Sequence, residues 1–274
     1  MYSSPADILA ALNEYRSYIA AESRRALDIF VPFITNAQEP EEGDFEDDFD
    51  VEKQRMEVLK QLIGYDTVLD NDGITAPAEL LERYDDLAPR LGLDGTFIID
   101  ADDERSRKQD EYFSAIEEAL KLKCIEEVRG MIAIPEEFRS LAEHVDGLHG
   151  PGLEYWRSKF QYAAWWGLIE DCEMYSRRVK TPDELTQWLS MTDMGWTIGG
   201  GWELGEGPDA ILFAVYCRRP EDDGWGWRYV LSREYGEELF ETIPEVLVWN
   251  AHFREHDLSK IPEFGEDDMW CLMF

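Results

Sequence analysis

The segment from 195 to 231 constrains the fold of this chain more than any other part of the sequence. It contains three short runs rich in β-branched and aromatic residues, and the connections between them are rich in Gly, Pro, Asp and Glu, a pattern typical of an antiparallel meander. The middle run, 210–217, consists of hydrophobic residues throughout, so both faces of this strand must be covered by other elements. The third run alternates in polarity, which places four large side chains on one face: Trp225, Trp227, Tyr229 and Leu231. We therefore expect this meander to form the core sheet, with helices covering it.

The net charge is a second constraint. The chain has 274 residues and a formal net charge of −34, yet its 10 Trp, 12 Tyr and 13 Phe give it the aromatic content of a globular protein. A negative field of this size repels nucleic acids and anionic membranes, so we expect no direct binding to either. The field is compatible with a basic partner protein, although the same charge also serves solubility alone.

Neither a secretory signal nor a membrane-spanning segment is expected. The first residues lack a basic stretch and an apolar stretch, and no window approaches the roughly 18 apolar residues that a spanning helix needs. The four cysteines are widely spaced, without a Cys-x-x-Cys pair: Cys124, Cys172, Cys217 and Cys271. We interpret them as free thiols of a cytoplasmic protein.

Two regions are expected from the patterning along the chain. Residues 1–104 are predicted to form a mostly helical N-terminal extension, with a lone strand at 95–100. Within this extension, 38–50 is an acidic run without Lys or Arg, which we expect to be a mobile loop. Residues 105–274 are predicted to form an α+β domain that contains the meander.

Proline and capping residues indicate where the helices begin. Ser3 or Ser4 is expected to cap a first helix, which Pro32 ends or kinks. Thr181 opens a capping box with Glu184, and proline stands at the first helical position between them. Further helices are expected over 51–63, from Pro77 onward, over 109–127, from Pro135 to a stop at Gly147, and from Ile243 onward. The aromatic-rich segment 153–175 is expected to mix helix and strand.

Taken in order, these elements resemble the SUKH superfamily, also described as Smi1/Knr4-like. The pattern of that family is a helix opened by an apolar residue and proline, then a Gly/Trp-rich antiparallel sheet, then a closing helix. The opening helix is similar at Ile134, Pro135, Phe138, Leu141 and Gly147; the start of the sheet at Trp196, Ile198 and Gly199; the central strand at 210–215; and the closing helix at 240–249. The similarity covers roughly 110–258, with Asp-Gly at 146–147 where the family has Asn-Gly and Ile-Pro at 243–244 where it has Ser-Phe.

The resemblance implies an α+β binding domain and not an enzyme. Bacterial members of this family act as immunity proteins that neutralise toxins, often nucleases or deaminases. Fungal members are cytoplasmic interaction and regulatory proteins. For this chain the resemblance therefore implies a protein partner, with no cofactor.

Three local patterns are similar to known sites of chemistry. His252 and His256 have the spacing of a shared metal site, but no nearby ligand completes it, so we expect surface histidines. The acidic turn 70–73 is similar to a calcium loop, but Val68 stands where the first ligand is needed. The glycines at 199–201 lack the Lys of a phosphate-binding loop, and we expect a bulge there. No nucleophile motif is present, so no catalytic residue and no metal ligand is assigned.

The last four residues, Cys271 to Phe274, have the form of a prenylation signal. The residues before them are acidic, whereas prenylated tails are usually basic. The alternative is an apolar tail whose Trp270 packs on the domain.

The sequence therefore predicts a non-enzymatic protein-binding protein, of which an immunity-type or regulatory binder of a basic protein is the most specific version. A first alternative is a carboxylate-dependent hydrolase, similar to a glycosidase, with an aromatic cleft. A second alternative is an acidic mimic of nucleic acid. The predicted binding surface is the second turn of the meander, with Glu221, Asp222, Asp223, Trp225 and Trp227. The competing interpretation of this turn is a solvated loop whose two tryptophans belong to the core.

Overall fold

The computed structural model describes residues 3–37, 50–63, 66–98, 102–148, 172–207, 210–233 and 236–252. These residues form two compact units. One unit contains the sheet and draws on 1–14, 96–150 and 159–250; the other is helical and is formed mainly by 15–95. The predicted α+β class, with an antiparallel sheet flanked by helices and a helical N-terminal region, is confirmed.

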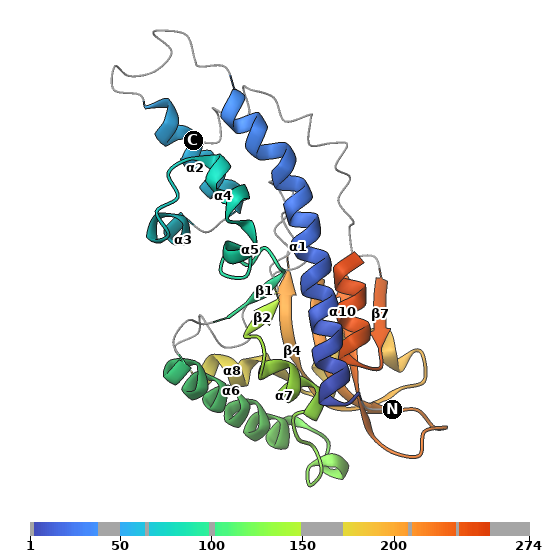
Figure 1. Cartoon of the computed structure of the whole chain (residues 1–274). Helices are drawn as coiled ribbons and strands as arrows, with labels where there is room; N and C mark the ends of the chain where they lie inside the picture. The colour runs from blue at the N-terminus through green and yellow to red at the C-terminus, as the bar shows by residue number, and fades with distance from the viewer. Residues whose placement is uncertain are drawn as a thin grey trace. The chain divides into compact units, whose positions relative to one another are not determined.

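The sheet has five strands in the order in which they occur in the chain, and every neighbouring pair is antiparallel. The strands are β3 (Val179–Lys180), β4 (Thr197–Gly207), β5 (Ala210–Arg218), β6 (Gly226–Arg233) and β7 (Gly236–Phe240). Strands β4 and β7 of this sheet are labelled in Figure 1. The three predicted strands are thus the centre of the sheet, and each edge carries one further short strand that was not predicted. The closing helix α10 (Ile243–His252) begins at the predicted residue, Ile243. Residue 240, which the resemblance included in this helix, lies in β7.

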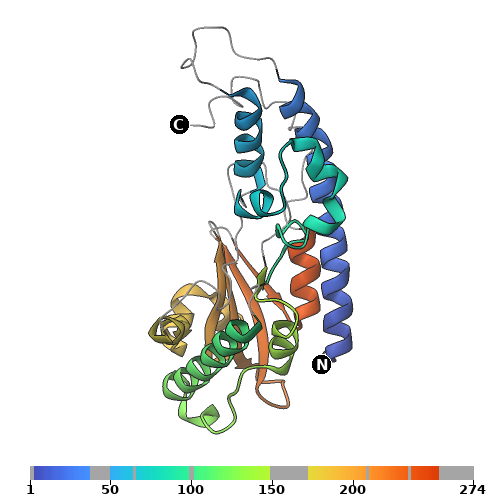
Figure 2. The same ribbon diagram turned by 60° about the vertical axis from the view of Figure 1, so that its left-hand side comes forward.

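The central strand β5 is covered on both faces, as its composition predicted. On one face, the β4 residue Trp202 is fully buried. Its ring makes a T-shaped contact with Phe138 of α7 (Glu136–Ala142). Its indole N–H donates to the Tyr112 hydroxyl of α6 (Asp102–Lys123) at 3.0 Å. We call this the α6 face; α6, α7 and α10 lie over it (Figure 2). On the other face, Phe213 and Val215 pack in one cluster with the helix α9 (Pro182–Trp188) and the short helix η2 (Ser190–Thr192). We call this the α9 face.

The glycine run 199–201 forms an irregularity in β4, as predicted. The register against β5 shifts between Ile198 and Gly200. A Cβ atom on Gly201 would lie 2.4 Å from the backbone oxygen of Ala214, so no larger residue fits at this position. Glycine therefore allows the two strands to approach each other where the sheet bends.

One prediction on the resemblance segment is wrong. Gly147 does not stop a helix in the left-handed conformation; it lies in the strand β2 (Gly147–Leu148) and pairs with Phe97 of β1 (Thr96–Phe97). Helix α7 ends earlier, at Ala142. The glycine lies beyond the end of α7 and pairs as an extended residue with β1. This pairing provides hydrogen-bond partners for the backbone of the segment.

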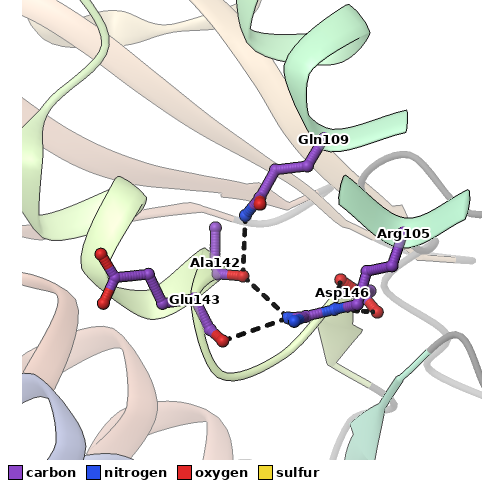
Figure 3. Close-up of polar contacts among 5 residues, drawn as sticks. All are labelled: Arg105, Gln109, Ala142, Glu143 and Asp146. Atoms are coloured by element: carbon purple, nitrogen blue, oxygen red, sulfur yellow. Dashed lines mark hydrogen bonds and ion pairs between the residues drawn. The ribbon is translucent and has the colours of Figure 1, made fainter. Parts of the chain in front are cut away.

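A buried ion pair secures the end of α7 instead (Figure 3). Asp146 is fully buried, and both of its carboxylate oxygens accept from Nε of Arg105, at 2.8 and 2.9 Å. Arg105 also donates from Nη2 to the carbonyl of Ala142 at 3.0 Å and to that of Glu143 at 3.3 Å, and the Gln109 amide donates to Ala142 at 3.0 Å. These donors from α6 satisfy carbonyls that the end of α7 leaves open.

The predicted helix starts agree with the structure at both capping positions. Thr181 accepts from the backbone N–H of Glu184 at 3.2 Å, and the Glu184 carboxylate accepts from the backbone N–H of Thr181 at 2.7 Å. At the first helix, α1 (Pro5–Asn36), the hydroxyl of Ser4 accepts from the backbone N–H of Asp7 at 3.3 Å. The remaining short elements of the sheet unit are η1 (Glu126–Val128) and α8 (Cys172–Arg178).

The helical unit is built from part of α1 and from α2 (Val51–Ile63), α3 (Asp66–Asn71), α4 (Pro77–Glu82) and α5 (Tyr84–Leu87). Its apolar core includes Leu27, Phe30, Leu59, Leu80 and Leu87. Helix α1 does not end at Pro32 but continues to Asn36, whose side-chain amide donates to the Pro32 carbonyl at 2.7 Å. The carboxylates of the acidic turn at 70–73 form ion pairs with basic side chains. Asp70 pairs with Lys60 at 2.9 Å, and Asp72 pairs with Arg83 at 3.3 Å and with Arg90 at 2.5 Å.

Several predictions concern residues outside the described ranges. They are residues 38–49 of the acidic loop, residues 153–171 of the aromatic-rich segment, His256, and the C-terminal residues 270–274. The domain boundary between 104 and 105 stays a prediction; this position lies within α6. In the part of the chain that the structure describes, no helix is long and apolar enough to cross a membrane.

Candidate functional site

The connection between β5 and β6 forms the predicted turn. The two strands pair up to Cys217 and Gly226, and residues 219–225 connect them. The Asp222 carboxylate accepts from the backbone N–H of Arg219 at 2.7 Å, and the backbone N–H of Asp222 donates to the Arg219 carbonyl at 3.1 Å. Asp222 therefore shapes the turn, because its side chain binds the turn's own backbone.

The other two acidic residues of the turn extend into solvent. Glu221 and Asp223 are exposed. The nearest cation to Glu221 is Nη1 of Arg219, at 3.9 Å, a distance that is too long for a hydrogen bond. Both carboxylates are thus accessible to a partner.

Trp225 is half-buried and is held in place by three neighbours. Its indole N–H donates to Oε1 of Glu127 in η1 at 3.2 Å. Its ring stacks on that of Tyr216, with centroids 5.9 Å apart and an interplanar angle of 22°. The Arg218 guanidinium lies 4.6 Å from the ring centroid. Arg218 also pairs with Glu127 at 3.2 Å, which closes the cluster. The indole is fixed in one orientation while part of it remains exposed.

Trp227 belongs to the core, in agreement with the competing interpretation of the turn. It is 5% exposed, and its indole N–H donates to the carbonyl of Ala133 at 3.0 Å. Its ring lies 5.1 Å from that of Trp202 and 5.0 Å from that of Tyr216. With its ring buried and its donor satisfied, Trp227 is not available to a partner at the surface.

The structure thus brings Glu221, Asp223 and Trp225 together at one end of the sheet, with Asp222 as a turn former and Trp227 beneath them. It adds Glu127 and Arg218, which were not predicted. The adjacent arginines at 218 and 219 were a signal for Arg218, because Asp and Glu outnumber Lys and Arg by 60 to 26 in this chain. The sequence contained no signal for Glu127. We call Glu127, Glu221, Asp223 and Trp225 the hairpin site.

An apolar cavity of about 20 Å³ lies on the α6 face. Its lining contains no titratable side chain: Phe138, Leu141, Leu148, Leu204, Gly205, Leu212, Ile243, Val246 and Leu247. A cleft that cleaves sugars needs two facing carboxyl groups, and this lining does not provide them.

Neither a metal site nor a reactive thiol is found among the described residues. Within the described ranges, no group of three His, Cys, Asp or Glu residues could hold a metal ion. Cys124 and Cys217 are buried free thiols. Burial raises the pKa of the Cys217 thiol to about 12, so that the reactive thiolate is scarce at neutral pH.

Comparison of the chain with protein-family models, with curated proteins and with solved structures found no match in any of the three. The resemblance to the SUKH superfamily stays a prediction from the motifs in the sequence.

Proposed function

We propose that this chain is a non-enzymatic protein-binding protein, similar in kind to the SUKH superfamily, and that it binds a basic protein through the hairpin site. The observation that carries the proposal is the fixed, half-exposed Trp225 beside the solvent-facing carboxylates of Glu221 and Asp223. Tryptophan is the residue type most enriched among the side chains that dominate binding energy. An indole that is already held in place loses little conformational entropy on binding.

The charge distribution supports the same proposal. The chain carries a formal net charge of −34, and Glu221 and Asp223 at the end of the hairpin are exposed. Such a field accelerates the encounter with a positively charged partner, and accessible carboxylates near an aromatic anchor orient it. An immunity-type or regulatory role in the cytoplasm, as the resemblance implies, is the specific form of this proposal.

Affinity capture with paired variants tests the proposal. The wild-type chain is immobilised beside a Glu221→Lys/Asp223→Lys variant and a control variant, Asp110→Lys/Glu118→Lys, which changes the net charge equally at two exposed positions of α6. Neither acidic residue of the hairpin pair takes part in the turn's hydrogen bonds, so the melting temperature should stay nearly unchanged.

We expect a basic protein that the wild type and the control retain at low salt and that the hairpin variant loses. Equal retention by all three proteins would contradict a role for the hairpin site. Loss from both charge-reversed variants would show attraction to net charge alone.

A further inference from the structure

Two arginines contact the ring of a tryptophan near the hairpin site. Trp196 precedes β4 and is 6% exposed on the α9 face. The guanidinium carbon of Arg219, in the turn, lies 4.3 Å from its ring centroid, and that of Arg228, in β6, lies 5.5 Å from it. We call these three residues the arginine–indole cluster.

The cluster has hydrogen-bond donors without acceptors. Trp196 Nε1, Arg219 Nε and Arg228 Nε are buried and have no hydrogen-bond partner. Arg228 donates from Nη1 to the carbonyl of Trp227 at 2.8 Å, but no acceptor lies within hydrogen-bonding distance of the Arg219 guanidinium among the described residues. Buried donors are normally satisfied, so three unsatisfied donors around one indole leave room for a further acceptor.

The neighbouring arginine, Arg218, has the carboxylate partner that Arg219 lacks at hydrogen-bonding distance. Arg218 lies over Trp225 at 4.6 Å in the same way, but it is paired with Glu127 at 3.2 Å. For Arg219 the nearest carboxylate is that of Glu221 at 3.9 Å, whose side chain is 67% exposed. Of the two arginine–tryptophan arrangements in this hairpin, the arginine–indole cluster is therefore the one without a hydrogen-bonded carboxylate.

We propose that the arginine–indole cluster binds a carboxylate of the partner protein, supplied by an Asp or Glu that lies within its basic surface. This inference rests on the proposed function. A carboxylate matches the planar donor fork of a guanidinium and accepts charge-assisted hydrogen bonds from it. A polyphosphate chain carries more negative charge than a carboxylate, so the Glu221 carboxylate, 3.9 Å from Arg219, repels it more strongly.

The partner segment would then carry both signs of charge. Its basic residues face Glu221 and Asp223, and its acidic residue faces Arg219 and Arg228. This combination gives specificity, because a uniformly basic protein would leave the two arginines unpaired and like charges facing each other.

The test follows the indole N–H signal of Trp196 by nitrogen–proton NMR, assigned by its loss in Trp196→Phe. The probes are sodium acetate, inorganic phosphate, and a blocked pentapeptide with one glutamate between two pairs of lysines; the same peptide with glutamine is the control. The variants are Arg219→Gln, Arg228→Gln and the matched control Arg218→Gln. None of these titrations needs the natural partner, so their failure is separate from a failure of the capture experiment.

We expect acetate and the glutamate peptide to shift the Trp196 signal saturably in the wild type and in Arg218→Gln. Arg219→Gln should weaken this binding roughly tenfold, as expected when a hydrogen bond to a charged group is lost. If Arg228→Gln alters the fold, Arg219→Gln alone decides the question, because its side chain is partly exposed. Equal shifts with the glutamate and glutamine peptides, a preference for phosphate, or an unchanged response in Arg219→Gln would overturn the proposal.

Discussion

The centre of the sheet and its hairpin end both use tryptophan, but they treat it differently. In the centre, the indoles of Trp202 and Trp227 are buried, each donates its N–H to an acceptor at 3.0 Å, and the two rings meet at 84°. At the hairpin end, Trp225 is half-exposed and Trp196 has an unpaired N–H, and arginines lie over both rings. In the centre both indoles are buried and hydrogen-bonded, whereas at the hairpin end one is half-exposed and the other lacks an acceptor. Such departures from local rules are expected where a protein binds something.

The largest expected effect is a difference in stability between alanine variants of two tryptophans, Trp227 and Trp225. Trp227→Ala should lower the free energy of unfolding by about 3–5 kcal/mol, because it opens a cavity against Trp202 and Tyr216. Trp225→Ala should cost only about 0.5–1.5 kcal/mol, since mainly its stacking on Tyr216 is lost. Urea denaturation of both variants measures the difference. Similar losses for the two would break the comparison.

A second pair of variants compares a satisfied arginine with an unsatisfied one. Arg105→Gln leaves the fully buried Asp146 carboxylate without its cation and should cost about 3–5 kcal/mol. Arg219→Gln removes a guanidinium that lacks a hydrogen-bonded acceptor and should cost less than about 1 kcal/mol. Both values come from chemical denaturation. If Arg219→Gln proves as costly as Arg105→Gln, Arg219 has a structural role and the arginine–indole cluster is not kept for a ligand.

Alkaline pH should weaken the centre of the sheet. Burial raises the pKa of Tyr112 to about 12, so the folded state holds this proton more tightly than the unfolded state does. The resulting stability is fully present below pH 10 and is lost as the pH rises from 10 to 12, a change on the order of 2–3 kcal/mol. Cys217, whose pKa burial also raises to about 12, adds to the decline from pH 9 upward.

Denaturation curves between pH 8 and 11 check this prediction, with Tyr112→Phe as the matched variant. The variant keeps the buried ring but has no hydroxyl to titrate, so its stability should fall less steeply with pH. A wild type and a variant with identical slopes would show that Tyr112 does not contribute.

The parts of the fold that could be predicted are those where a local pattern determines the structure. Residues 210–217 are hydrophobic at every position, so a strand covered on both faces follows directly. Thr181, with proline and Glu184 after it, fixes a helix start through its own hydrogen bonds. The edge strands β3 and β7 could not be predicted, because two residues are too few for a period and Gly236–Phe240 begins with two glutamates after its glycine.

The candidate site shows a similar limit. Alternation correctly placed Trp225 and Trp227 on one side, where both contact Tyr216. Alternation does not indicate how far along a strand the covering helices reach, and this decides that Trp227 is buried while Trp225, beyond the strand end, is not. The contribution of Glu127 comes from a contact 98 positions away in the sequence, which a single sequence does not reveal.

The association rate of the captured partner, measured against ionic strength, tests the central claim most directly. For the wild type and for Asp110→Lys/Glu118→Lys, we expect a rate that falls steeply as salt increases, because steering by the hairpin site is screened. For Glu221→Lys/Asp223→Lys, the rate at low salt should be several-fold lower and its salt dependence shallower, with the melting temperature unchanged. If all three proteins gave the same rate and the same salt dependence, the hairpin site would not be the surface that receives the partner.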